Sequence, residues 1–270
     1  MPNYICTVCG TQYPESTGYP VDICHICAED RQYVREVGQE WTTLEDLRPT
    51  HHNEIRTLEP NLTGIATVPT FAIGQRPLLI QTPAGNVLWD CISFIDDATV
   101  EALNALGGVD AIAISHPHFY SSMVEWSRAF GDAPVYLHRD NEPWVMRPDR
   151  CIVYWETETH TLLPGITLIR CGGHFPGSSV LHWAEGADGK GAIMTGDTIM
   201  VVNDTNWVTF MYSYPNYIPL NKAAVQRIVA AVEPYAFDRI YSSWWERVTK
   251  SGGKEAVHRS AERYIRAISD

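Results

Sequence analysis

Residues 115–122 read Ser-His-Pro-His-Phe-Tyr-Ser-Ser and follow directly on the largely apolar run Val109–Ile114. A short apolar run of this kind predicts a buried strand. Side chains two positions apart at a strand end can project to the same side, so His116 and His118 can reach one metal ion. The stretch therefore predicts a metal-binding loop at the end of a core strand.

Two further motifs place potential ligands after predicted strands. Residues 172–178 read Gly-Gly-His-Phe-Pro-Gly-Ser and put His174 in a glycine-rich loop. Residues 195–198 read Thr-Gly-Asp-Thr and put Asp197 after the apolar run Ala192–Met194. Each motif alone is a weak signal, but together they supply three imidazoles and a carboxylate at strand ends.

The order of these three motifs resembles that of the metallo-β-lactamase-fold hydrolases, over the chain from about Gly64 onward. The resemblance implies an αββα sandwich, an α/β fold with a metal site at one edge. It also implies that His116, His118 and His174 are the imidazole ligands of the first metal and that Asp197 is the carboxylate that normally bridges two metals. Asp90 matches the family's early aspartate, which would orient a metal ligand without itself binding the metal.

Three departures from this family pattern concern the second metal. The family continues its first motif with Asp and His, where this chain has Tyr120 and Ser121. The family's last strand usually ends in Gly-His, whereas Ile240–Trp245 contains no histidine. Asp197 would be the one remaining ligand of the second metal, so we expect one metal ion in this pocket.

Three neutral histidines with an open position form the ligand set of a catalytic zinc, which lowers the pKa of bound water to about 7. We therefore predict a mononuclear zinc hydrolase, with iron as the alternative metal in this pocket and with metal-bound water or hydroxide as nucleophile. Asp197 is then either a fourth ligand or the base. Tyr120 is a poor base but a good hydrogen-bond donor, so it is either an oxyanion donor or a packing residue beside Phe119.

Four of the seven cysteines form two Cys-x-x-Cys pairs near the N-terminus: Cys6, Cys9, Cys24 and Cys27. Paired spacing of this kind predicts a metal site rather than a disulfide framework. The first pair resembles a rubredoxin knuckle, whereas the second lacks the usual Pro and Gly. We predict a small zinc-ribbon or rubredoxin-like module that holds structural zinc, with iron as the alternative.

Composition excludes several function classes. The 270-residue chain has a net charge of −12 and a pI near 5.2, which argues against binding nucleic acid through its phosphates. No apolar run is long enough to span a bilayer, and no signal peptide is evident. We expect a cytoplasmic protein that acts on a small molecule and has no nucleic-acid or membrane partner. The sequence is compatible with a monomer or a homo-oligomer.

The chain is predicted to contain a cysteine module (residues 1–38), a polar connecting segment (39–63) and the metallo-β-lactamase-fold domain (64–270). Gln39–Glu59 shows little periodicity. From Ile65 the patterns predict strands at Ile65–Ile73, Leu78–Thr82, Asn86–Asp90, Val109–Ser115, Pro134–His138, Cys151–Trp155, Thr159–Leu163, Ile166–Cys171, Ser179–Trp183, Ala192–Thr195 and Arg239–Ser242. Helices are predicted at Asp97–Leu106 and Ser121–Phe130, with apolar helical faces at Ala224–Val232 and Val257–Ile268.

The leading functional hypothesis is hydrolysis of an ester, thioester, lactone or related acyl bond. One alternative is a degenerate member of the fold that binds without catalysis. The other is an iron-dependent redox protein that uses the rubredoxin-like module. The aromatic segment 206–217 is either a wall of the substrate pocket or a loop packed on the sheet.

Overall fold

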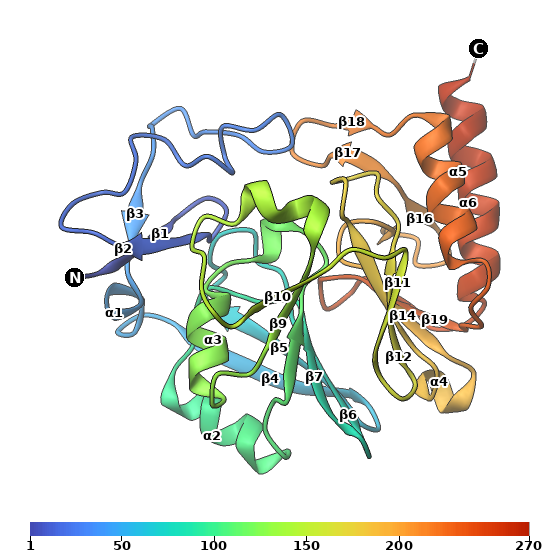
Figure 1. The fold of residues 1–270 in the computed structure, drawn as a ribbon. Coiled ribbons are helices and arrows are strands. Elements are labelled where there is room, and N and C mark those ends of the chain that lie inside the picture. The colour runs from blue at the N-terminus through green and yellow to red at the C-terminus, as the bar shows by residue number, and fades with distance from the viewer. Residues whose placement is uncertain (270) are drawn as a thin grey trace. The chain divides into compact units, whose positions relative to one another are not determined.

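The computed structural model describes residues 1–269 and contains two compact units. The first comprises Met1–Leu137 and Glu142–Tyr154, and the second comprises His138–Asn141 and the chain from Trp155 onward. Figure 1 labels their helices and strands.

A seven-stranded mixed sheet forms the centre of the first unit, in the order β10-β9-β8-β7-β6-β5-β4. Its strands are β4 (His52–Glu59), β5 (Leu62–Val68), β6 (Leu78–Thr82), β7 (Gly85–Trp89), β8 (Ala111–Ala113), β9 (Val135–His138) and β10 (Ile152–Trp155). The β7-β8 and β8-β9 pairs are parallel, whereas the pairs from β4 to β7 are antiparallel. β8 is fully buried, as a strand with parallel neighbours on both sides usually is.

The helices of the first unit are short: α1 (Leu44–Leu47), α2 (Asp97–Ala105), the 3₁₀ turn η1 (Pro117–Phe119) and α3 (Met123–Ala129). A further 3₁₀ segment, η2 (Arg139–Trp144), runs across the boundary between the units. α2 begins where the Asp96 carboxylate accepts a hydrogen bond of 2.8 Å from the Thr99 amide. It ends before Gly107 and Gly108, which both have positive φ.

The N-terminal residues form a separate small sheet in the order β2-β1-β3, with strands β1 (Asn3–Cys6), β2 (Gln12–Glu15) and β3 (Trp41–Thr42). The four N-terminal cysteines are at the centre of a hydrophobic cluster here. Ile73, Trp144 and Met146, from later parts of the chain, pack against the same cluster. The N-terminal segment therefore shares its core with the rest of the first unit.

The second unit contains a six-stranded sheet in the order β11-β12-β13-β14-β19-β20 and two small hairpins. The sheet strands are β11 (Thr159–Leu163), β12 (Ile166–Arg170), β13 (Ser179–Trp183), β14 (Ala192–Met194), β19 (Arg239–Tyr241) and β20 (Val248–Thr249). The hairpins pair β15 (Met200–Val201) with β16 (Val208–Thr209), and β17 (Met211–Ser213) with β18 (Ile218–Pro219).

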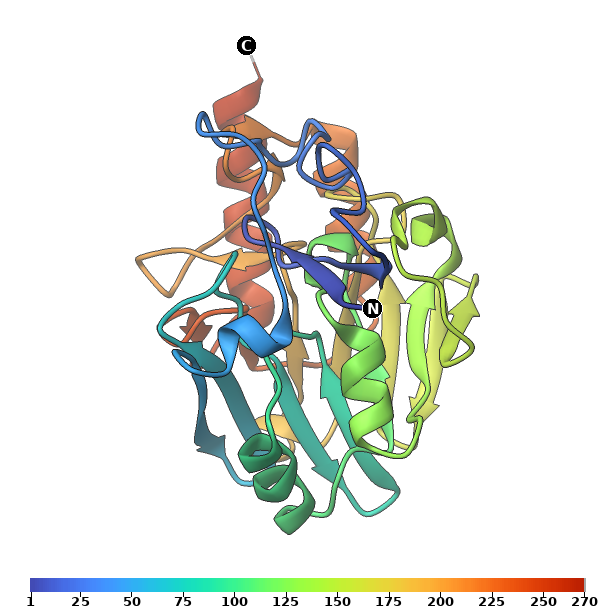
Figure 2. The same ribbon diagram turned by 90° about the vertical axis from the view of Figure 1, so that its left-hand side faces the viewer.

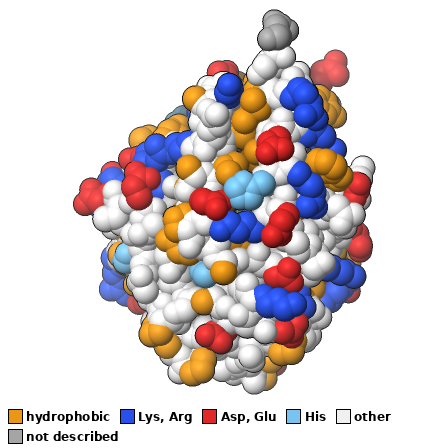
Figure 3. All heavy atoms as spheres, turned by 90° about the vertical axis from the view of Figure 1, so that its right-hand side faces the viewer, with side chains coloured by type: hydrophobic (Ala, Val, Ile, Leu, Met, Phe, Trp, Pro, Cys, Tyr) orange, Lys and Arg blue, Asp and Glu red, His pale blue; other side chains and the backbone are white. Residues whose placement is uncertain are grey.

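Two long helices, α5 (Lys222–Val232) and α6 (Gly253–Ile268), cover the core of this unit, and α4 (Gly186–Gly189) is a single irregular turn. Val225, Ile228 and Val232 of α5 join Val257 and Ala261 of α6 in one hydrophobic cluster. Around these helices the outer surface mixes acidic and basic side chains (Figure 3). Among the described residues, no helix has both the length and the apolar character needed to cross a bilayer.

The helices and most strands predicted after Ile65 are present, with ends shifted by a few residues. The predicted strand Ile65–Ile73 is wrong at both ends, because β5 starts at Leu62 and stops at Val68, before a cis peptide bond to Pro69. Gln39–Glu59, whose sequence shows little periodicity, contains β3, α1 and β4. β4 was missed because it is a polar edge strand.

Candidate metal centres

The four N-terminal cysteines form a cluster, which we term the cysteine site: Cys6, Cys9, Cys24 and Cys27. All four side chains are buried, and their sulfur atoms lie within 4.8 Å of one another. The Cys6–Cys27 and Cys9–Cys24 sulfur pairs are 3.5 and 3.6 Å apart. Tetrahedral zinc with Zn–S bonds of about 2.3 Å requires sulfur atoms about 3.8 Å apart, so the cluster fits such an ion.

Polar neighbours approach the sulfur atoms from outside the cluster. The Gln39 amide nitrogen donates to Cys6 Sγ at 3.2 Å, and the Tyr13 hydroxyl donates to Cys24 Sγ at 3.5 Å. Hydrogen bonds from neighbouring thiols hold the pKa of Cys6 well below its ordinary value, whereas burial raises the pKa of Cys9. When a metal cation binds, its charge stabilises the thiolate form of all four cysteines. Metal binding therefore releases protons.

The other cysteines and His25 lie apart from this cluster. Cys91, Cys151 and Cys171 are buried, as free cysteines often are. Burial raises the pKa of the Cys91 and Cys171 thiols, so both remain protonated at neutral pH. His25, the neighbour of Cys24, is exposed.

His116 and His118 are brought together in the first unit, where η1 follows β8 directly. Their ring centroids are 5.2 Å apart, and both side chains are at most 1% exposed. The Ser115 hydroxyl lies 2.8 Å from His116 Nδ1 and can accept a hydrogen bond from it, which leaves Nε2 for a ligand. The predicted pairing of these histidines is therefore present.

Asp90 stabilises the backbone just before this pair. Its Oδ1 accepts a hydrogen bond of 2.8 Å from the Ser115 amide, and its own amide donates to Ala113 O. Asp90 has a φ of 65°, a conformation that aspartate tolerates better than most residues. The carboxylate thus positions the start of the histidine loop, in keeping with the orienting role that the resemblance implies.

His174 and Asp197 are brought together in the second unit. His174 Nε2 lies 3.8 Å from Asp197 Oδ2, and both side chains are buried. His174 Nδ1 lies 3.2 Å from the Met211 carbonyl oxygen, which can only accept a hydrogen bond. Nδ1 therefore carries the proton and Nε2 carries the lone pair, the arrangement of a metal-ligating histidine.

The aromatic segment 206–217 contributes to this second pair. The Tyr214 hydroxyl donates to the Asp197 carbonyl oxygen at 2.9 Å, and burial raises the pKa of Tyr214. Phe210 is buried in the core, whereas Tyr217 is 85% exposed. The Met211 carbonyl could not have been identified from sequence, since any residue supplies that atom.

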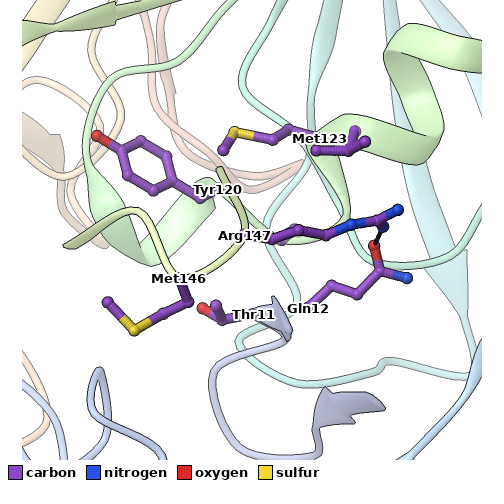
Figure 4. Close-up of a pocket in the computed structure, with 8 residues that line it drawn as sticks. Thr11, Gln12, Tyr120, Met123, Met146 and Arg147 are labelled. Atoms are coloured by element: carbon purple, nitrogen blue, oxygen red, sulfur yellow. Dashed lines mark hydrogen bonds between the residues drawn. The ribbon is translucent and has the colours of Figure 1, made fainter. Parts of the chain in front are cut away.

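Tyr120 is buried in the first unit, in the wall of a cavity of about 10 Å³, which has room for about one water molecule. Figure 4 shows its hydroxyl pointing away from Gln12 and Arg147 on the opposite wall. Arg147 is also buried and hydrogen-bonds Gln12 Oε1. No sequence signal marks Arg147, because its neighbourhood reads as an ordinary polar loop.

The loop that carries His174 is packed closely against His138 and Asn141. The Gly177 amide donates to Asn141 Oδ1 at 2.9 Å. A Cβ atom at Gly177 would lie 2.9 Å from that oxygen and 2.9 Å from His138 Nδ1.

We therefore expect Gly177→Ala to lower the free energy of unfolding by about 1–3 kcal/mol, because the added methyl overpacks the loop. Urea denaturation measures the change. Gly18→Ala is the matched control, since a Cβ there meets nothing within 4 Å. Equal midpoints for the two variants would contradict this account of the loop.

Comparison with known proteins gives one close relative. No family profile matches this sequence. The chain is 49% identical over 271 residues to a Bacillus subtilis (strain 168) protein named "Uncharacterized protein YmaE", and the match covers 100% of this chain and 98% of the relative.

Solved structures share the fold at low sequence identity. The metallo-β-lactamase DIM-1 has a TM-score of 0.59 at 9% identity, covering 81% of this chain and 98% of that one. FIM-1 from Pseudomonas aeruginosa, in its mono-zinc form, has a TM-score of 0.58 at 14% identity, covering 80% and 97%. A peroxy diiron species of the chemotaxis sensor ODP has a TM-score of 0.54 at 16% identity, covering 79% and 94%.

These likenesses confirm the fold class that the three motifs predict, and the cysteine cluster is consistent with the predicted N-terminal metal-binding module. The chain therefore belongs to the same family as YmaE of Bacillus subtilis and has the metallo-β-lactamase fold.

Proposed function

We propose that this protein is a mononuclear zinc hydrolase of acyl bonds. In this proposal His116 and His118 of the first unit and His174 and Asp197 of the second bind one metal ion, and we term this set the histidine site. The observations that carry the proposal are the burial of the four side chains within their units and the tautomer of His174. Three imidazoles and one carboxylate are buried, and His174 is held in the tautomer that leaves Nε2 for a metal.

The donor set supports zinc. Three imidazoles match the protein ligands of a catalytic zinc site, whose fourth position stays open for water, and Asp197 is then either a fourth ligand or the base. Tyr120 and Ser121 stand where the family has second-metal ligands, and neither side chain is an imidazole or a carboxylate. A mononuclear site is the arrangement that these residues favour.

The proposed roles follow from chemistry and position. A bound zinc would supply a Lewis acid that acidifies water and polarises an acyl carbonyl. Asp197 would hold or accept a proton beside His174, since its Oδ2 lies 3.8 Å from that ring. Asp90 would keep His116 in place through the Ser115 amide. Tyr120 would donate its hydroxyl to an oxyanion.

The substrate class that we propose is a small ester, thioester or lactone. The test is a panel of such substrates with the purified, zinc-loaded protein and with His116→Ala as the inactive control. Turnover that is lost in His116→Ala supports the proposal. Turnover in neither protein would favour the degenerate binding protein, and equal turnover in both would show that the histidine site does not carry the reaction.

Metal content provides a separate prediction. We expect about two metal ions per chain, one in each site, because each donor set suits a single tetrahedral ion. Elemental analysis of protein purified without chelator measures the ratio. A third ion per chain, lost selectively in Asp197→Ala, would contradict the mononuclear arrangement.

A further inference from the structure

The N-terminal module contacts the loop that follows His118. The Gln12 amide donates a hydrogen bond of 3.0 Å to the Ser121 carbonyl oxygen. The Ser93 hydroxyl donates a hydrogen bond of 2.8 Å to the Gly10 carbonyl oxygen. Figure 2 shows the N-terminal strands, in dark blue, beside the green segment that carries α3. Two points of the module are thus tied to the histidine-bearing part of the first unit.

These contacts begin at the first cysteine knuckle itself. The Cys6 amide donates to Thr11 O at 3.0 Å, and the Gly10 amide donates to Cys6 O at 2.9 Å, which closes the turn. Thr11 Oγ1 lies 3.3 Å from Cys9 Sγ. Gln12, the next residue, makes the contact with Ser121. Two residues, Gly10 and Thr11, therefore separate the ligand Cys9 from the residue that contacts the loop.

Arg147 adds a second connection. Its guanidinium hydrogen-bonds Gln12 Oε1 and pairs with Glu125 Oε1 of α3 at 2.5 Å. The Arg147 side chain is 9% exposed, so the pair is largely shielded from solvent. The module and the start of α3 are closely packed around a cavity of about 10 Å³ (Figure 4), so a shift of the module would move the loop.

The loop adopts a backbone conformation that needs such support. Ser121 has a φ of 45°, in the left-handed region that residues with side chains disfavour. The Gln75 side-chain amide donates to Ser121 Oγ at 3.0 Å, and the Ser122 hydroxyl donates to Ser93 O at 2.5 Å. The Gln12 amide adds the hydrogen bond to the Ser121 carbonyl oxygen. Ser121 is one of the positions at which the chain departs from the family pattern.

We propose that the cysteine site is a positioning element for His118. Metal on the four cysteines holds Gly10, Thr11 and Gln12 in their turn, and these residues hold Ser121. Loss of that metal loosens residues 116–126 and lowers the affinity of the histidine site for its own metal. The occupancy of one site thereby controls the other, through contacts that lie wholly within the first unit.

The first experiment measures hydrogen exchange and does not require the histidine site to bind metal. Removal of metal with Cys27→Ser, which lies in the second knuckle, is expected to accelerate amide exchange in residues 116–126 by tenfold or more, on the order of what local unfolding produces. The helix α5 of the second unit serves as the internal reference. Unchanged exchange in residues 116–126 would overturn the proposal.

The second experiment breaks the contacts and keeps all four cysteines. Ser93→Ala and Arg147→Met should retain zinc at the cysteine site, yet raise exchange in residues 116–126 by about fivefold for each hydrogen bond lost. The matched controls are Ser16→Ala and Arg150→Met. Ser16 bonds Gly18 at the exposed part of the module, and Arg150 is 83% exposed. Equal exchange in variants and controls would overturn the proposal.

A third measurement concerns the histidine site and rests on the proposed function. With zinc on the cysteines, cobalt is titrated into the histidine site and its visible absorption is followed. We expect Ser93→Ala and Arg147→Met to weaken cobalt binding by about 10-fold, as loss of outer-shell support typically does. Faster exchange without any cobalt binding in the wild type would contradict the proposed function and leave the positioning role standing. Equal cobalt affinity in variants and wild type would overturn the coupling.

Discussion

His118→Ala is expected to remove the metal of the histidine site and to abolish hydrolysis. Substitutions that only disturb the outer shell of a metal ligand typically cost about 10- to 100-fold in affinity or activity. The loss of a ligand should exceed that, since two histidines and one carboxylate would remain. Elemental analysis should fall from about two metals per chain to about one, and the acyl-substrate panel should show no turnover.

The thermal midpoint of His118→Ala should stay near that of the metal-free wild type, because the imidazole lies in a loop after β8. His52→Ala is the matched control, since His52 is exposed on β4 of the same unit. Full activity in His118→Ala would contradict the assignment of this residue as a ligand. A large fall in stability with retained metal would mean that its role is structural.

Cys27→Ser is expected to cause the largest loss of stability. Structural zinc contributes about 10–16 kcal/mol of apparent binding free energy in isolated zinc-finger peptides, and that energy is also folding energy. The N-terminal module contains little regular structure beyond the two short strands β1 and β2, so it depends on its metal. Residues 1–38 should become susceptible to proteolysis, and one metal ion should be lost per chain.

Cys171→Ser is the control that separates loss of stability through loss of metal from the cost of burying a serine hydroxyl. Cys171 is fully buried and lies outside the cysteine site, so its replacement should destabilise modestly and leave the metal content unchanged. Metal loss in both variants, or in neither, would contradict the structural role of the cysteine site.

Candidate site residues could be identified in the sequence because metal chemistry restricts which residue types can serve. His-x-His after an apolar run and two Cys-x-x-Cys pairs are rare unless the residues bind metal, and both groups meet within their units as expected. Much of the strand pattern was also predictable. The fully buried strand β8, for example, reads directly as the apolar run Ala-Ile-Ala.

The contacts between the module and the histidine loop could not be predicted from sequence. They involve backbone atoms of Gly10, Gln12 and Ser121, which carry no residue-type signal. The same holds for the Met211 carbonyl behind His174. The division of the chain into residues 1–38, 39–63 and 64–270 stays a prediction, as does the small-molecule partner.

The polar character that concealed β4 has a consequence for contact between molecules. β4 is the last strand of its sheet, so part of its backbone has no neighbouring strand to pair with inside the sheet. It carries Glu54 and Arg56, whose side chains form an ion pair of 2.6 Å and remain partly exposed. Charged side chains on an outer strand discourage another chain from extending the sheet by β-augmentation. The same residues that made the segment resemble a linker therefore protect the protein against aggregation along this edge.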